Sequence, residues 1–189
     1  MKYFLQKKNV GKKSQSGFTL IETLVAISIL MVAITGPLVV ASQVLNYSYF
    51  ARDQITAFYL AQDAIEYIHN VRDSNALVNL QNAEQVSWLT NLNSCLVQNG
   101  MCRFDSNLSP DALGNIVGCP AEGCAPLNYD SSTGLYAYGG GDVSKFTREI
   151  NIIETDADRE ASITVTIKWN TGSLTGKSIS VNEHIFNWH

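Results

Sequence analysis

The feature that most constrains this chain is a long apolar segment near its N terminus. From Phe18 to Leu45 most residues are Leu, Ile, Val or Ala, and Glu22 is the only charged residue before Arg52. Because about 20 apolar residues are enough to cross the hydrocarbon core of a bilayer as a helix, this run of about 28 can span a membrane. An unpaired carboxylate in hydrocarbon costs several kcal/mol, so we expect Glu22 to have a cationic partner.

The partner of Glu22 can come from the backbone itself. If the chain were cut between Gly17 and Phe18, the new α-amino group would lie four residues before Glu22. That amino group, from the same chain or from a neighbouring copy, would supply the missing positive charge.

The residues around this junction resemble a known motif. Lys12 and Lys13 precede the run Ser16-Gly17-Phe18-Thr19-Leu20-Ile21-Glu22 and the apolar segment. This arrangement resembles the prepilin cleavage and methylation motif shared by type IV pilins and type II secretion pseudopilins. The resemblance implies that Gly17 ends the leader, that Phe18 becomes the N-methylated first residue, and that Glu22 aligns subunits in a filament.

The same resemblance implies a set of partners. They are a prepilin peptidase that also methylates the new amine, other pilin or pseudopilin subunits, and a membrane assembly platform with its ATPase. The resemblance is strongest over residues 12–75. Within it, the run Leu60-Ala61-Gln62-Asp63-Ala64-Ile65-Glu66 resembles the helix of minor pilins more than that of a major subunit.

Charge indicates the orientation of the chain. The formal net charge is −4, and removing the five leader lysines leaves 8 basic against 17 acidic residues, a net charge of −9 for residues 18–189. The basic leader predicts a cytoplasmic N terminus, with the remainder outside the inner membrane and then in a periplasmic or extracellular filament. An acidic chain is poorly suited to sequence-independent nucleic-acid binding, and no nucleic-acid site is expected.

An ordinary secretory signal peptide is the alternative for the N terminus. Its apolar region would be only about 7–15 residues long and would end in small residues, and Val39-Val40-Ala41 before Ser42 is an acceptable cleavage site. Such a signal requires neither the Gly17-Phe18 junction nor an acid at Glu22.

Two segments of the predicted helix differ in character. Gly36-Pro37 predicts a helix break, either a kink or local melting, because proline removes a backbone hydrogen bond. Whether this weak point loosens during filament packing or is merely a kink is left open.

Residues 46–75 continue the helix with an amphipathic pattern, and we expect His69 to lie off the apolar stripe, in solvent. The stripe comprises Phe50, Ala57, Leu60, Ala61, Ala64, Ile68 and Val71.

Residues 76–145 are predicted to be irregular and to contain the four cysteines. Cys95 and Cys102 enclose one short loop, and Cys119 and Cys124 enclose another. Four cysteines allow three pairings; we prefer the two sequence-local pairs, although the sequence alone does not select them. A zinc site is disfavoured, since the spacings are wider than C-x₂-C and no histidine lies in this region.

Residues 146–189 have the clearest strand pattern. In the run from Ala161 to Trp169, apolar and polar residues alternate, which predicts one buried and one exposed face. Flanking strands over Phe146–Ile153 and Ser178–Ile185, joined by short turn-rich segments, predict an antiparallel meander. Covered by the amphipathic helix, this sheet gives an α+β, pilin-like fold with a leader at residues 1–17 and a membrane helix at 18–45.

No catalytic motif accompanies this architecture. The histidines His69, His184 and His189 are scattered, and neither a nucleophile–base signature nor a phosphate-binding motif is present. We therefore do not expect an enzyme, a cofactor or a metal. The resemblance to prepilins and to the helix of minor pilins implies a minor structural subunit of a type IV pilus or related filament. The alternatives are a type II secretion pseudopilin and, in another class, an anchored or secreted binding domain that does not polymerise.

Overall fold

The main elements of the described residues are one long helix and a seven-stranded sheet. The computed structural model describes residues 17–81, 86–108, 115–172 and 174–187. The chain divides after Leu45 into two units. Helix α1 (Leu20–Gln81) supplies the regular structure of the described part of the first unit and the first element of the second. The predicted α+β, pilin-like fold is confirmed.

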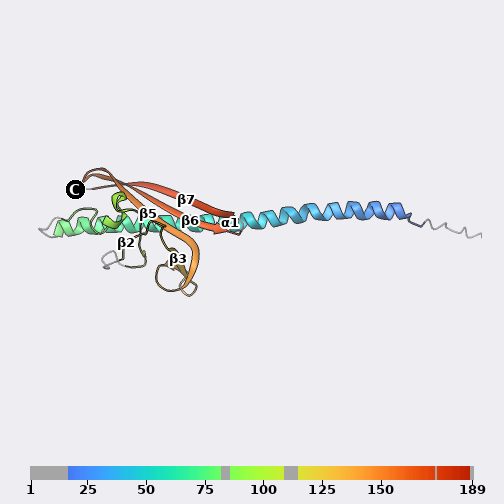
Figure 1. Ribbon diagram of the computed structural model, residues 1–189, viewed down its shortest axis with the longest axis horizontal. Coiled ribbons are helices and arrows are strands. Elements are labelled where there is room, and N and C mark those ends of the chain that lie inside the picture. The colour runs from blue at the N-terminus through green and yellow to red at the C-terminus, as the bar shows by residue number, and fades with distance from the viewer. Residues whose placement is uncertain (1–16, 82–85, 109–114, 173, 188–189) are drawn as a thin grey trace, which may run out of the picture. The chain divides into compact units, whose positions relative to one another are not determined.

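The sheet of the second unit is centred on three long antiparallel strands. β5 (Asp142–Asp156), β6 (Glu160–Thr171) and β7 (Leu174–Phe186) form the predicted meander, in which β6 pairs with both neighbours. In Figure 1 these strands run beside the part of α1 that belongs to the same unit. Each strand is longer than the sequence predicts, because ladder pairing continues into the turn residues.

Four short strands line the other edge of β5. β1 (Cys102–Arg103) and β3 (Pro126–Asp130) both pair with β5, while β2 (Val117–Gly118) pairs with β1 and β4 (Leu135–Ala137) pairs with β3. The 3₁₀ helices η1 (Asn93–Cys95) and η2 (Val97–Asn99) precede β1. Residues 76–145, predicted to be irregular, therefore contain the regular strands β1, β2 and β3.

The predicted apolar stripe of α1 forms the helical side of the core. Ala57, Ala61, Ala64 and Ile68 are fully buried, and Phe50 packs against the same cluster from the core's margin. The opposing side comes from alternate residues of the sheet, as the period of two predicts. These residues are Ile150, Ile152, Ile163, Val165, Ile167 and Trp169.

Helix α1 ends at Gln81, six residues beyond the predicted end at Asn75. The Asn75 amide donates to the carbonyl oxygens of Trp88 (3.0 Å) and Thr90 (2.9 Å), and Asn79 exchanges two hydrogen bonds with the backbone of Val86. Asn normally ends a helix because its side chain competes for the hydrogen bonds of the helix backbone. Here both Asn side chains bond to the returning chain instead, so the helix continues.

The glycines at 139–141 lead directly into β5, which begins at Asp142. Gly141 has a φ of +69°, and a Cβ atom there would lie 2.5 Å from the carbonyl oxygen of Tyr129. Only glycine tolerates this close approach, which lets β5 enter the sheet beside β3. The predicted boundary of the meander at Phe146 is therefore four residues late.

Candidate functional site

The N-terminal segment begins with a capped helix. Gly17, Phe18 and Thr19 precede α1, and the Thr19 hydroxyl accepts a hydrogen bond from the backbone N–H of Glu22 at 3.3 Å. The Thr19 carbonyl also accepts from Glu22 (3.1 Å) and Thr23 (3.2 Å). Thr-x-x-Glu is the spacing of a capping box, so Thr19 is the N-cap residue and the helix starts at Leu20.

The side chain of Glu22 is available for a partner. It is exposed in the first turn of α1, and in the described part of the chain its carboxylate has no hydrogen bond or ion pair. The positive end of the helix dipole favours a negative charge at this position, but only by a fraction of a kcal/mol where solvent screens it. A cation from another molecule would therefore find this carboxylate unpaired.

The rest of the first unit is an apolar helix without internal cover. From Phe18, which is 78% exposed, to Leu45, which is 60% exposed, no described side chain is buried. α1 is long and apolar enough to cross a membrane, which is consistent with membrane anchoring.

The hydroxyl groups of this apolar helix are suited to lipid. Each donates to a backbone carbonyl three or four residues earlier, so none depends on water for a hydrogen bond. The donors and acceptors are Thr23 to Leu20, Ser28 to Leu24, Thr35 to Val32 and Ser42 to Val39, at 2.8–3.2 Å. Glu22 is the one charged group of this segment and, like the Gln43 amide, has no such bond among the described residues.

The expected helix break at Gly36 and Pro37 does not interrupt α1, which is helical through both residues. Local melting is therefore absent from this form of the protein. An internal proline removes one backbone hydrogen bond and its ring crowds the preceding turn, so the alternative of a kink at this point stays a prediction. Loosening of this point during assembly stays a prediction.

The two disulfides are the sequence-local pairs, Cys95–Cys102 and Cys119–Cys124. The first pair is fully buried and belongs to the hydrophobic core, between η1 and β1. The second closes a five-residue separation beside β2 and is half-buried. The first disulfide therefore contributes to the packed interior as well as closing a loop.

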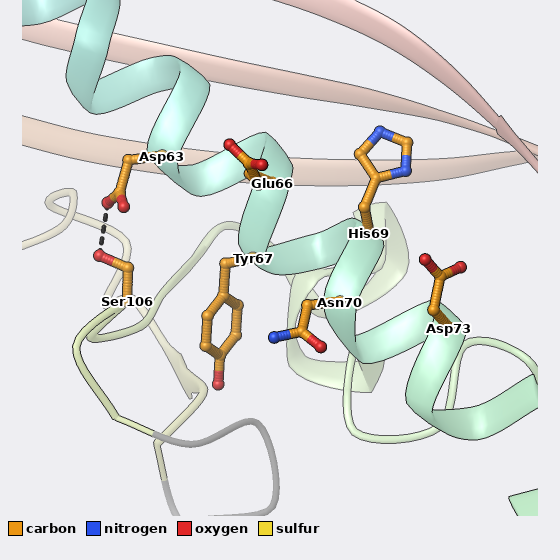
Figure 2. Close-up of a pocket in the computed structure, with 7 residues that line it drawn as sticks. All are labelled: Asp63, Glu66, Tyr67, His69, Asn70, Asp73 and Ser106. Carbon is orange, nitrogen blue, oxygen red and sulfur yellow. Dashed lines mark hydrogen bonds between the residues drawn. The ribbon is translucent and has the colours of Figure 1, made fainter. Parts of the chain in front are cut away.

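A polar pocket of about 520 Å³ lies against α1 in the second unit. Figure 2 shows Asp63, Glu66, His69 and Asp73 along successive turns of the helix, with Ser106 opposite Asp63. Tyr67 and Asn70 complete the lining. The Ser106 hydroxyl donates to Asp63, and the Asn115 amide donates to the Tyr67 hydroxyl at 2.6 Å. Several lining groups thus already have partners within the protein.

His69 is not a solvated residue, contrary to the prediction. Its Nε2 lies 2.8 Å from a carboxylate oxygen of Glu183 on β7, and its side chain is 29% exposed. Among the described residues, no three His, Cys, Asp or Glu side chains gather as a metal site would require. The pocket can therefore offer hydrogen bonds and negative charge.

Arg148 is the residue of the second unit that sequence reasoning missed. It lies on β5, and its side chain is only 1% exposed. One terminal guanidinium nitrogen donates to Asp63 (2.8 Å) and to the Leu60 carbonyl (3.3 Å), and the other terminal nitrogen donates to the Phe104 carbonyl (2.8 Å). The available signal was the alternation of side chains along a strand. Phe146, Ile150 and Ile152 face inward, and Arg148 lies between them on the same face.

Comparison with known proteins supports one assignment. The family model described as the prokaryotic N-terminal methylation motif matches residues 12–36, which include the Gly17-Phe18 junction and Glu22. No curated protein and no solved structure gives a match. The motif implies processing by a prepilin peptidase and assembly with other pilin subunits, and it points to a structural subunit rather than an enzyme. The N-terminal segment of this chain is the type IV prepilin and pseudopilin signature.

Proposed function

We propose that this chain is a minor structural subunit of a type IV pilus or a related filament. A prepilin peptidase cleaves it between Gly17 and Phe18 and methylates the amine of Phe18. The mature chain is anchored in the inner membrane with its second unit outside that membrane. A membrane assembly platform with its ATPase then moves the chain into the filament.

One observation carries this proposal: α1 begins with an exposed apolar surface whose one charge, the Glu22 carboxylate, has no partner among the described residues. Removing apolar area from water is favourable by about 25 cal/mol per Å². This exposed surface is therefore stabilised by contact with lipid or with other helices. In a bundle of such helices Glu22 requires a cation, since a lone charge there costs several kcal/mol. The Phe18 amine of a neighbouring subunit meets that need.

The acidic second unit with two disulfides and the helix resembling that of minor pilins support a low-abundance subunit rather than the bulk subunit. The disulfides suit an oxidising location outside the inner membrane. A type II secretion pseudopilin has the same N-terminal signature. Neighbouring genes distinguish the two, because a retraction ATPase accompanies pili whereas secretion-specific components accompany pseudopilins.

Replacement of Glu22 tests the proposal. In Glu22→Ala, leader cleavage persists, but incorporation into sheared surface filaments falls at least about tenfold, because the neighbouring amine is left unpaired in an apolar core. Glu66→Ala is the matched control, since it removes the same charge from the exposed face of the same helix. Its incorporation equals that of the unmodified chain.

Quantitative immunoblotting of membrane and sheared fractions measures both effects. If Glu22→Ala enters filaments as well as the control does, the alignment role is wrong. If neither the unmodified chain nor the control is found in the sheared fraction while both accumulate in membranes, the chain is an anchored domain that does not polymerise.

A further inference from the structure

The cleavage junction lies immediately before the start of α1. Gly17 and Phe18 are outside the helix, and Thr19 is the last residue before it. Three hydrogen bonds define that boundary: one to the Thr19 hydroxyl and two to its carbonyl oxygen. The scissile peptide, between Gly17 and Phe18, is thus one residue away from the residue that stops the helix.

Only the hydroxyl bond depends on the side chain at position 19. Both carbonyl bonds persist with any residue there, whereas the bond from the Glu22 N–H to the hydroxyl at 3.3 Å needs an oxygen on the side chain. That bond stabilises a non-helical backbone at Thr19, because N-cap residues keep extended φ and ψ angles. Without this bond, the non-helical conformation of Thr19 loses its stabilisation, and we expect the helix to extend toward Phe18 and Gly17.

Extension of the helix would hide the scissile peptide. In a helix the backbone is tightly wound and its carbonyl groups accept hydrogen bonds, so attack on the peptide carbon requires local unwinding. Cleavage needs an exposed, extended backbone in which the reacting atoms can align. In the structure Gly17 and Phe18 are exposed, and Phe18 retains 78% of its accessible surface.

We propose that Thr19 is a positioning residue for leader cleavage. Its hydroxyl caps α1 and thereby keeps the Gly17-Phe18 peptide outside the helix, where the peptidase reaches it. This inference rests on the proposed function, because it assumes cleavage at that peptide. It assigns to the Thr19 side chain a role that is separate from the charge of Glu22.

The test is the rate of leader removal from the full chain in membranes that contain prepilin peptidase. Thr19→Val keeps the shape of the side chain but removes the cap, and it is cut about fivefold more slowly. Thr19→Ser and Thr19→Asn restore a capping oxygen and are cut at close to the unmodified rate. Thr23→Val is the matched control, since the Thr23 hydroxyl donates to Leu20 within the helix and caps nothing.

A second readout separates backbone shape from recognition of the side chain. In detergent micelles, the Cα chemical shifts of Gly17 and Phe18 move toward helical values in Thr19→Val and stay unchanged in Thr19→Ser. Equal cleavage rates for Thr19→Val and the unmodified chain would overturn the inference. So would slow cleavage of Thr19→Asn with unchanged chemical shifts, which would show that the peptidase reads threonine itself.

Failure of the inference is distinguishable from failure of the proposed function. If the unmodified chain is not cut between Gly17 and Phe18, the proposed function is wrong. If it is cut there and Thr19→Val is cut equally fast, only the role of Thr19 is wrong.

Discussion

Arg148 joins three parts of the second unit through one buried cation. Its guanidinium donates to Asp63 and the Leu60 carbonyl on α1 and to the Phe104 carbonyl after β1. The same group lies 5.2 Å from the centre of the Phe104 ring. Replacing Arg148 removes all of these contacts at once, so the attachment of α1 to β5 should weaken strongly.

The magnitude follows from the number of bonds that are lost. Hydrogen bonds from a charged donor contribute about 1.5 kcal/mol each, so three give about 4.5 kcal/mol. In Arg148→Met the new apolar side chain returns roughly 1.5 kcal/mol through burial. Asp63 is 46% exposed and regains water, so it adds little further cost. We therefore expect the free energy of unfolding to fall by about 3 kcal/mol.

Urea unfolding of the full chain in detergent micelles measures this change. The fluorescence of Trp88 and Trp169, each 3% exposed, reports on the core. Arg148→Lys is the matched control: it keeps the charge, but a single ammonium group does not reach three acceptors, and it costs about half as much. A free energy for Arg148→Met within about 0.5 kcal/mol of the unmodified value would refute the reasoning.

A double-mutant cycle checks the pairing with Asp63. Asp63→Ala alone leaves the buried guanidinium without its carboxylate and should cost about 2 kcal/mol. In the Arg148→Met background the same change should cost only about 0.5 kcal/mol, because the cation is gone and only the exposed hydrogen bond from Ser106 is lost. Additive costs for the two substitutions would show that the contact between Asp63 and Arg148, at 2.8 Å, contributes no coupling energy.

Two further predictions concern the disulfides and pH. Replacing Cys95 and Cys102 by Ala should lower the free energy of unfolding by about 3 kcal/mol, against about 2 kcal/mol for Cys119 and Cys124, because only the first pair is buried in the core. Equal losses in urea unfolding would contradict this order. Burial raises the pKa of Tyr138, although Arg148 and Arg103 partly oppose the shift. As pH rises above about 10, the unfolded state therefore loses this proton before the folded state does, and stability falls. Tyr138→Phe should make that fall shallower, and an unchanged slope between pH 9 and 11 would contradict the assignment.

The sequence predicts those parts of the fold that depend on local periodicity. The stripe of α1 and the alternation from Ile163 to Trp169 each have a period that only one secondary structure satisfies. The apolar segment from Phe18 has no such period, and its length predicts a membrane helix. The meander also follows, since short turns between such strands leave no room for a crossover.

The parts that the sequence did not predict depend on contacts between distant residues. Asn75 would usually end a helix, but its amide bonds to the chain 13 and 15 positions later. His69 appears solvated on a helical wheel, yet it meets Glu183, 114 positions away. The short strands β1 and β3 carry little pattern of their own and become strands by pairing with β5. No local pattern encodes these partners.

The candidate site divides in the same way. The motif places Gly17, Phe18 and Glu22 by sequence alone, because a peptidase reads a short linear segment. Their roles in processing and alignment stay predictions, since they involve the peptidase and neighbouring subunits. Arg148 shows the converse case: strand alternation predicts its inward direction, but its three acceptors come from α1 and the segment after β1.

The measurement that tests the central claim most directly is the mass and N-terminal sequence of the mature protein. The mature protein should be recovered both from membranes and from filaments sheared off the cell surface. The account predicts a chain that begins at N-methylated Phe18, lacks residues 1–17 and is present in the sheared fraction. A chain that begins at Ser42, or one that retains Met1 and the leader, would contradict it.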